Sequence, residues 1–165
     1  MSFSIADFEE TAVATLSTIT SETVIFSHQN APRPSGPYVT LQVLNFIQRG
    51  EPEEIQNNGD GQKVTQWSEM TLQIKAVGLD AMIRAFAIRN AMGLRWVVDA
   101  FAGVFAGVGE ISSIQNIPVV RTNGWEDQSV FDVIFNVVTE TAETLPYIAT
   151  VELDGEISDR TLTIE

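Results

Sequence analysis

Hydrophobic residues recur at two different periods along this chain. Near the amino end, spacings of three and four place Ile5, Phe8, Ala12, Leu16 and Ile19 on one stripe, which predicts a helix. Farther along, apolar and polar residues alternate from 70 to 76, which predicts a strand with one buried and one polar face. The chain therefore combines helices with sheet.

Further strands are predicted from β-branched and aromatic runs bounded by turn residues. They cover residues 23–26, 38–48, 111–117, 130–138 and 147–153. The run 38–48 has apolar residues at both odd and even positions, as expected for a strand that is covered on both faces or paired across subunits. An acidic, turn-rich tract follows it, and we expect a mobile hairpin connection there.

Two helices are predicted between the strands. Asp80 is expected to cap a helix that carries on one side Ile83, Phe86, Ala87, Asn90 and Ala91. A second helix covers 94 to about 105, and the sequence AGVFAGVG is expected to end it in a loop. This order predicts an α+β fold in a single domain over residues 1–165, with a mainly antiparallel sheet, helices on one face and an arm at 155–165.

Charge and composition argue against several classes of function. The 22 acidic and 9 basic residues give a formal net charge of −13, and a strongly acidic surface opposes binding to phosphate backbones. The chain has no cysteine, which excludes disulfides, thiolate metal ligands and cysteine nucleophiles. The start MSFSIADFEE shows no secretory signal, so we expect a soluble protein made in a cytoplasm.

Candidate catalytic residues are few. His28 is the single histidine, and no G-x-S-x-G motif accompanies it. The acidic pairs Glu9–Glu10 and Glu53–Glu54 are more typical of solvated faces than of two catalytic carboxylates. We predict no catalytic, cofactor-binding or metal-binding residue. A small acidic hydrolase that uses His28 or a carboxylate pair is the enzymatic alternative.

The most unusual segment is NAPRPSGPYVTL, residues 30–41. Pro32, Pro34 and Pro37 fix their own φ and push each preceding residue into an extended conformation, which predicts a stiff rod that projects Arg33. Such a rod suits a contact surface, and it equally suits an entry loop that blocks edge-to-edge pairing. An adaptor that presents this segment as a recognition ligand is a further alternative.

The three tryptophans lie in two kinds of surroundings. Trp96 lies beside Val97 and Val98 in a predicted helix, so we expect it in the core. Trp67 and Trp125 lie near turns in polar surroundings, where a half-buried aromatic side chain either anchors a partner or packs at a sheet edge.

Several segments together resemble the neck and tail terminator proteins of tailed bacteriophages. They are QNAPRPSGPYVTLQV, a T-Q-W turn, the strand MTLQIKAVG, a helix with A-x-x-R-A and I-R-N-A-M, IQNIPVV, WEDQSVFDVIF and IATVEL. The resemblance covers roughly residues 5 to 155. The matching residues are Pro32, Arg33, Pro34, Pro37, Tyr38, Trp125 and Glu126. The acidic tract after Gly50 and the glycine-rich end of the second helix depart from the family pattern.

The resemblance implies a structural protein of the virion tail or neck, assembled in the host cytoplasm. It implies a homo-oligomeric ring, typically a hexamer, that caps the tail tube, stops its polymerisation and contacts the head-to-tail connector. DNA would pass through the lumen without specific binding, and acidic side chains there would repel its phosphates. The expected subunit or partner interface comprises Pro32, Arg33, Pro34, Pro37, Tyr38, Trp67, Trp125 and Glu126, with no cofactor and no membrane contact.

Overall fold

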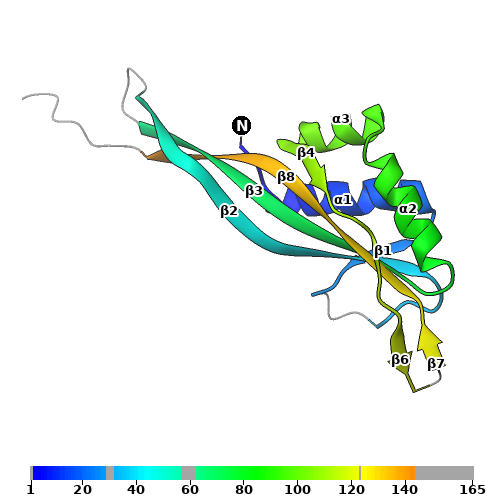
Figure 1. Cartoon of the computed structure of the whole chain (residues 1–165). Coiled ribbons are helices and arrows are strands. Elements are labelled where there is room, and N and C mark those ends of the chain that lie inside the picture. The colour runs from blue at the N-terminus through cyan, green and yellow to red at the C-terminus, as the bar shows by residue number, and fades with distance from the viewer. Residues whose placement is uncertain (1, 29–31, 57–61, 123, 144–165) are drawn as a thin grey trace, which may run out of the picture.

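The computed structural model describes residues 2–28, 32–56, 62–122 and 124–143 (Figure 1). Its helices are α1 (Ile5–Thr20), α2 (Ala81–Ala91) and α3 (Arg95–Gly103). Its strands are β1 (Thr23–Phe26), β2 (Tyr38–Gln56), β3 (Gln62–Val77), β4 (Ala106–Ile111), β5 (Gln115–Asn116), β6 (Val119–Arg121), β7 (Gly124–Glu126) and β8 (Gln128–Glu143). The strand expected at 147–153 and the arm expected at 155–165 lie outside the described residues.

The main sheet has the order β1-β2-β3-β8-β4, and β5 pairs with the start of β8. The short β1 runs parallel to β2, and the other neighbouring strands are antiparallel. The strands β6 and β7 form a separate hairpin. The α+β class and the mainly antiparallel sheet are therefore confirmed.

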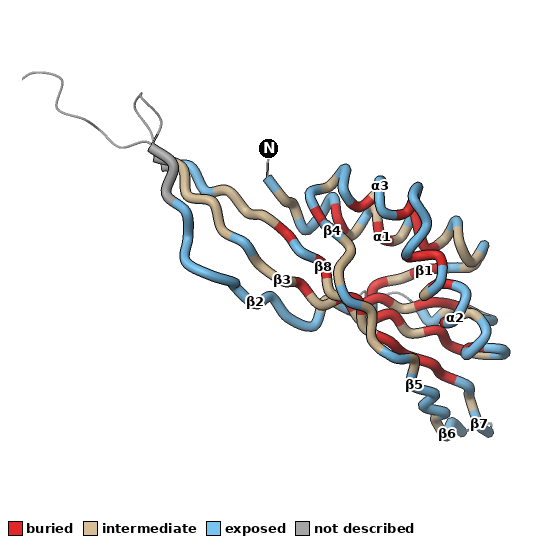
Figure 2. Tube along the Cα trace, turned by 45° about the horizontal axis from the view of Figure 1, so that its top comes forward, coloured by how far each residue is buried: buried red, intermediate tan, exposed pale blue. Residues whose placement is uncertain are grey.

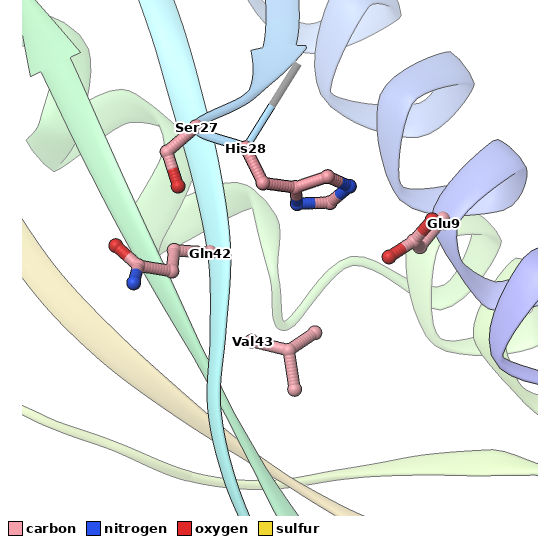
Figure 3. Close-up of a pocket in the computed structure, with 5 residues that line it drawn as sticks. All are labelled: Glu9, Ser27, His28, Gln42 and Val43. Atoms are coloured by element: carbon pink, nitrogen blue, oxygen red, sulfur yellow. The ribbon is translucent and has the colours of Figure 1, made fainter. Parts of the chain in front are cut away.

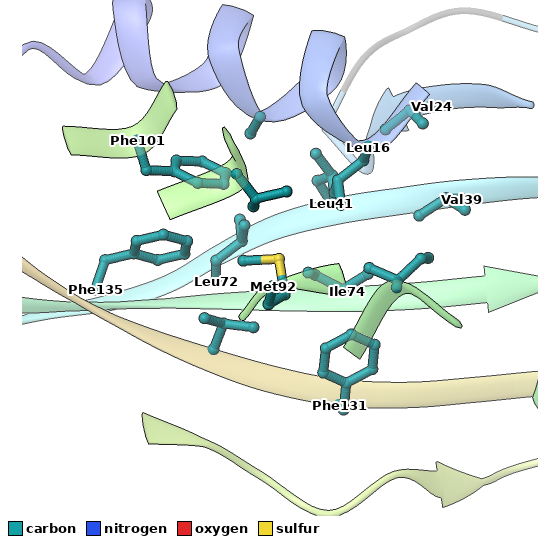
Figure 4. Packing of buried hydrophobic residues seen from close by; sticks show 14 of the residues in the cluster. Leu16, Val24, Val39, Leu41, Leu72, Ile74, Met92, Phe101, Phe131 and Phe135 are labelled. Carbon is teal, nitrogen blue, oxygen red and sulfur yellow. The ribbon is translucent and has the colours of Figure 1, made fainter. Parts of the chain in front are cut away.

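Register places the apolar residues of neighbouring strands side by side. Leu41 of β2 pairs with Ile74 of β3, which pairs with Phe131 of β8, and all three side chains are buried. Because side chains alternate between faces along a strand, these ladders make one face of the sheet apolar. The core cluster joins this face to residues of all three helices (Figure 4). In Figure 1 the helices lie together on one side of the sheet.

Three aromatic rings occupy the middle of this core. Phe8 of α1, Phe101 of α3 and Phe135 of β8 are each fully buried. Their ring centroids lie 5.6 Å (Phe8–Phe101), 5.0 Å (Phe8–Phe135) and 4.8 Å (Phe101–Phe135) apart, within the range of favourable aromatic pairs. This cluster fastens two helices to the sheet.

The strands β2, β3 and β8 extend past the helices as a three-stranded arm (Figures 1 and 2). The sequence predicted shorter strands, with an acidic connection after residue 48, but the β2–β3 ladder continues to the pair Gln56 and Gln62. Lys63 and Glu140 form an ion pair of 2.8 Å across the arm. The hydrogen bond from Lys63 lowers the pKa of the Glu140 carboxyl. Cross-strand pairing therefore outweighs the turn-like composition of this tract.

The glycine-rich sequence AGVFAGVG was predicted as a loop, and that prediction is wrong because part of it forms β4. A Cβ atom at Gly109 would lie 2.8 Å from the carbonyl oxygen of Ile134 on β8. The two backbones approach closely next to the irregularity between Val108 and Ile111, which only a glycine permits. Glycine here marks close strand contact.

The helix α2 buries a different side from the one that its apolar pattern predicted. Its buried residues are Ala81, Ala85, Ile88 and Ala91, whereas Ile83 and Phe86 are exposed. Trp96 of α3 was expected in the core and is 45% exposed, so that prediction is also wrong. Small alanine side chains allow α2 to approach the sheet closely, and its large apolar side chains therefore face outward.

Candidate functional site

Two residues considered for the enzymatic alternative, His28 and Glu9, line an open hollow beside α1. Glu9 comes from α1, His28 and Ser27 follow β1, and Gln42 and Val43 belong to β2 (Figure 3). Ser27, His28 and Glu9 share no hydrogen bond, although they line the same hollow, and the His28 ring contacts Phe26 instead. Since an activated nucleophile requires hydrogen-bonded serine, base and acid, this arrangement supports no triad chemistry.

Metal binding has no support in the described part of the chain. No group of three or more His, Asp or Glu side chains lies close enough there to hold an ion. The same residues contain no helix of the length and apolar character needed to cross a membrane.

The proline segment is anchored inside its own chain. The guanidinium of Arg33 forms an ion pair with Glu126 of β7 and lies over the ring of Tyr38, 5.4 Å from its centroid. Glu126 also accepts hydrogen bonds from Arg121 at 3.2 Å and Gln128 at 3.0 Å. Three predicted interface residues, Arg33, Tyr38 and Glu126, are thus in contact, although Arg33 and Glu126 are far apart in the sequence.

The segment turns before it enters β2. Gly36 has a φ of 114°, so the predicted straight rod is bent there. A Cβ atom at Gly78 would lie 3.3 Å from the Cα atom of Pro37, and the Gly78 amide donates to the backbone carbonyl of Asp127 at 2.8 Å. Close packing therefore joins the proline segment, the end of β3 and the start of β8.

Two predicted interface tryptophans lie at different places. Trp125 lies on β7, next to Glu126, and lines a hollow together with Leu79. Trp67 lies on β3 ten positions before Val77, which is about 33 Å along a strand. Both are exposed. The predicted interface residues therefore divide into a group at the hairpin end and Trp67 on the arm.

Exposed apolar side chains also occur outside the eight residues of the predicted interface. On the arm they are Leu44, Phe46 and Ile47, and around α2 they are Leu79, Met82, Ile83 and Phe86. The arm group lies in the run 38–48, which the sequence indicated as covered on both faces or paired across subunits, whereas the α2 group was not predicted as a contact surface. The sequence of α2 shows that the alanines at 81, 85 and 91 share one side and the larger apolar residues another, but it does not decide which side is buried.

Replacing Glu126 with glutamine is expected to loosen the β6–β7 hairpin. The substitution removes the charge that holds Arg33 and Arg121, while the stability of the whole chain changes by less than about 1 kcal/mol because these cations are half-exposed. Hydrogen exchange of the backbone amides at 119–126 should accelerate. Glu110→Gln removes an exposed charge on β4 and serves as the control. Unchanged exchange at the hairpin in the Glu126 variant would contradict this role.

The fold and its surface define an α+β protein that exposes apolar side chains on an arm and on a helix, as proteins that assemble with others do. A search of curated proteins finds no match. The family model described as phage neck terminator protein matches residues 10–161, and the chain belongs to this family. It is therefore a structural protein of the phage neck, which confirms the resemblance.

Proposed function

We propose that this chain forms a ring, typically a hexamer, that caps the tail tube, stops its polymerisation and joins it to the head-to-tail connector. The observation that carries the proposal is the arm, whose β2 edge has no strand partner over most of its length in the described structure. In β2, only Tyr38 to Leu41 pair with β1. From Gln42 onward, the outer edge of β2 is open to a neighbouring copy.

The free hydrogen-bonding groups on this edge can be assigned. The carbonyl of Asp132 accepts a bond from the Ser112 amide, on the side of β8 away from β3. Along a strand, the N–H and C=O groups of successive residues point to opposite sides of the strand. In an antiparallel pair, two directly opposite residues either both point these groups toward each other or both point them away from each other. Following the register across β3 places the amides of Phe46 and Gln48 on the open edge.

The chain protects one part of this edge and leaves another part open. Near the tip, Gly50, Glu51, Pro52 and Glu53 bring a register shift, a proline and charges, which are devices that prevent strand addition. A register shift also lies at Leu44, but the stretch 45–48 beyond it has no proline and no charge, and Leu44, Phe46 and Ile47 are exposed there. An edge that is both apolar and unprotected fits pairing with another strand.

Among the residues that the structure describes, a second open edge lies on β8. The strand β4 pairs with β8 only as far as Val137, and the Phe3 amide binds the carbonyl of Val138. Because β2 and β8 are both antiparallel to β3, they run in the same direction. Rotation about a ring axis would bring β2 of one copy beside β8 of the next as a parallel pair, which is the head-to-tail contact that closes a ring.

The helix-free face of the arm suits the passage of DNA. Its cations are bound by acids, with Arg49 and Glu69 2.6 Å apart and Lys63 and Glu140 2.8 Å apart. Cations that are already paired attract phosphates weakly. In the proposed ring this face would line the lumen, so that DNA passes without adhering.

The variant Gln48→Pro tests the ring. Proline removes an amide that faces the open edge and leaves the β3 ladder intact, so the folded chain should remain while the ring mass is lost. Native mass spectrometry of the purified chain gives the assembly state, and circular dichroism gives the fold. Tube capping is checked by tail lengths in electron micrographs of particles carrying the variant, where overlong tails are expected.

The matched control is Gln48→Ala. Both variants lose the 2.6 Å hydrogen bond from the Gln48 side chain to Gln66, but only proline removes the backbone donor. A ring that persists in the proline variant, or that disappears equally in both variants, would exclude pairing through this edge.

A further inference from the structure

The most exposed apolar side chains of the described chain gather around one end of α2. Trp125 is 75% exposed, Leu79 73% and Ile83 67%, and Phe86 and Met82 are also exposed. We call these five residues the α2 patch. An exposed apolar group of this kind, with a tryptophan among its members, is typical of a protein contact site.

The α2 patch is continuous across two elements. Met82, Ile83 and Phe86 share one side of α2 because residue 86 follows the other two by four and three positions, and Leu79 lies just before the N-cap residue of the helix. Leu79 and Trp125 line one hollow of about 370 Å³, together with Gly78, Glu126 and Asp127. The Arg33–Glu126 ion pair holds the strand that carries Trp125. The hollow is thus lined by residues from the turn between β3 and α2 and from the end of β7.

Two carboxylates border the α2 patch. Asp80 precedes α2 and Asp127 follows β7, and both side chains are exposed. Neither carboxylate forms an ion pair with a described cation, and Asp80 makes no side-chain capping bond. A partner that covers the patch would bring basic groups to these positions, because opposite charges at the rim favour encounter and register.

A second copy of this chain offers few such basic groups. Six of the eight described cations are already bound to acids of their own chain: Arg33, Arg49, Lys63, Arg84, Arg95 and Arg121. Of the other two, Arg89 donates to the carbonyl of Ser112 and Lys75 lies on the helix-free sheet face. The described surface therefore lacks free cations beside an apolar protrusion.

We infer that the α2 patch is the docking site for a different virion protein, which presents an apolar protrusion bordered by lysine or arginine. The arm and the α2 patch then have separate roles, since the arm joins copies of the chain and the patch binds the neighbour. This inference rests on the proposed function in assigning the partner to the phage particle. It adds the surface, the residues and the chemistry of that partner.

Binding to purified phage parts tests the inference. Tail tubes and DNA-filled heads are purified from particles assembled without this chain, and fluorescently labelled chain is titrated onto each. Wild-type chain is expected to bind one of these probes. Ile83→Asp should weaken that binding at least about 30-fold, because a charge replaces an apolar contact, and Phe86→Ala should weaken it about tenfold.

The charges are tested separately. Asp80→Asn with Asp127→Asn should weaken binding about fivefold at low salt and flatten its salt dependence. Asparagine suits position 80, whose φ is 59°. The control Glu10→Gln with Glu110→Gln removes the same charge at two exposed positions away from the patch and should leave binding unchanged.

The outcomes separate the two proposals. If wild-type chain binds a probe as a monomer, the ring is excluded. If Ile83→Asp also weakens that binding, the α2 patch is supported. Unchanged binding of Ile83→Asp would exclude the patch and leave the ring. If Ile83→Asp abolishes the ring mass instead, the patch joins copies of the chain and the inference fails. It also fails if wild-type chain binds neither probe.

Discussion

Replacing Phe135 with alanine is expected to lower the free energy of unfolding by about 3–5 kcal/mol, the usual loss for a buried phenylalanine. Phe135 is fully buried and contacts both Phe8 and Phe101. Its removal leaves a cavity between the sheet and two helices, and rigid neighbours collapse into such a space only partly. Urea denaturation followed by circular dichroism measures the change.

The control for this substitution is Phe86→Ala. It makes the same chemical change on the exposed face of α2, where the stability loss should stay near 0.5 kcal/mol, as for other surface substitutions. The pair also separates folding from docking, because Phe86 belongs to the α2 patch and Phe135 does not. Equal stability losses in the two variants would show that the aromatic cluster is not the centre of the core.

The first helix and the central strands could be predicted from local pattern. Ser4 caps α1 because its side-chain oxygen accepts a 3.5 Å hydrogen bond from the Asp7 amide. The alternation at 70–76 gives the buried face of β3 directly, and Gly78 ends that strand with a φ of 99°. In these elements the residues that determine the conformation are close together in the sequence.

The predictions failed where tertiary contacts outweigh local preference. The helix α2 is apolar on two sides, and its pattern alone cannot decide which side is buried. The decision depends on the space above the sheet, which suits the alanines at 81, 85 and 91. Likewise, β4 is rich in glycine because it lies close to β8, a contact that no local period reveals.

The candidate contact residues were predicted by type but not by arrangement. Arg33 was expected to project outward, and its charge is instead bound by Glu126. The pairing depends on where β7 lies relative to the proline segment, and sequence spacing holds no such information. The role of Trp67, Trp125 and the prolines at an interface stays a prediction, since exposure alone does not identify a partner.

The separation of the two surfaces has a physical basis in the fold. The arm consists of strands that extend beyond the helical layer, so its β2 edge is accessible to a neighbouring copy (Figure 1). The α2 patch lies on the outer side of the helical layer and at the hairpin end. A ring built through the arm would therefore leave the patch free for another component of the neck.

Replacing Arg84 with methionine is expected to lower the free energy of unfolding by about 3 kcal/mol. Arg84 binds Glu22 at 2.8 Å and donates to the carbonyls of Val77 and Leu79, and its side chain is only 13% exposed. Methionine keeps much of the apolar contact but leaves a partly buried carboxylate and two carbonyls without this donor. The substitution should also loosen Leu79, so binding through the α2 patch should weaken.

The control for Arg84 is Arg95→Met. Arg95 also lies in a helix and pairs with an acid, Asp99 at 3.6 Å, but its side chain is 94% exposed. Loss of an exposed helical pair of this kind lowers the free energy of unfolding by about 0.3–0.5 kcal/mol. Thermal and urea denaturation of both variants measure the difference. If Arg84→Met were as stable as Arg95→Met, water would replace the lost donor, and Arg84 would not be what joins α2 to β3 and to the segment before β1.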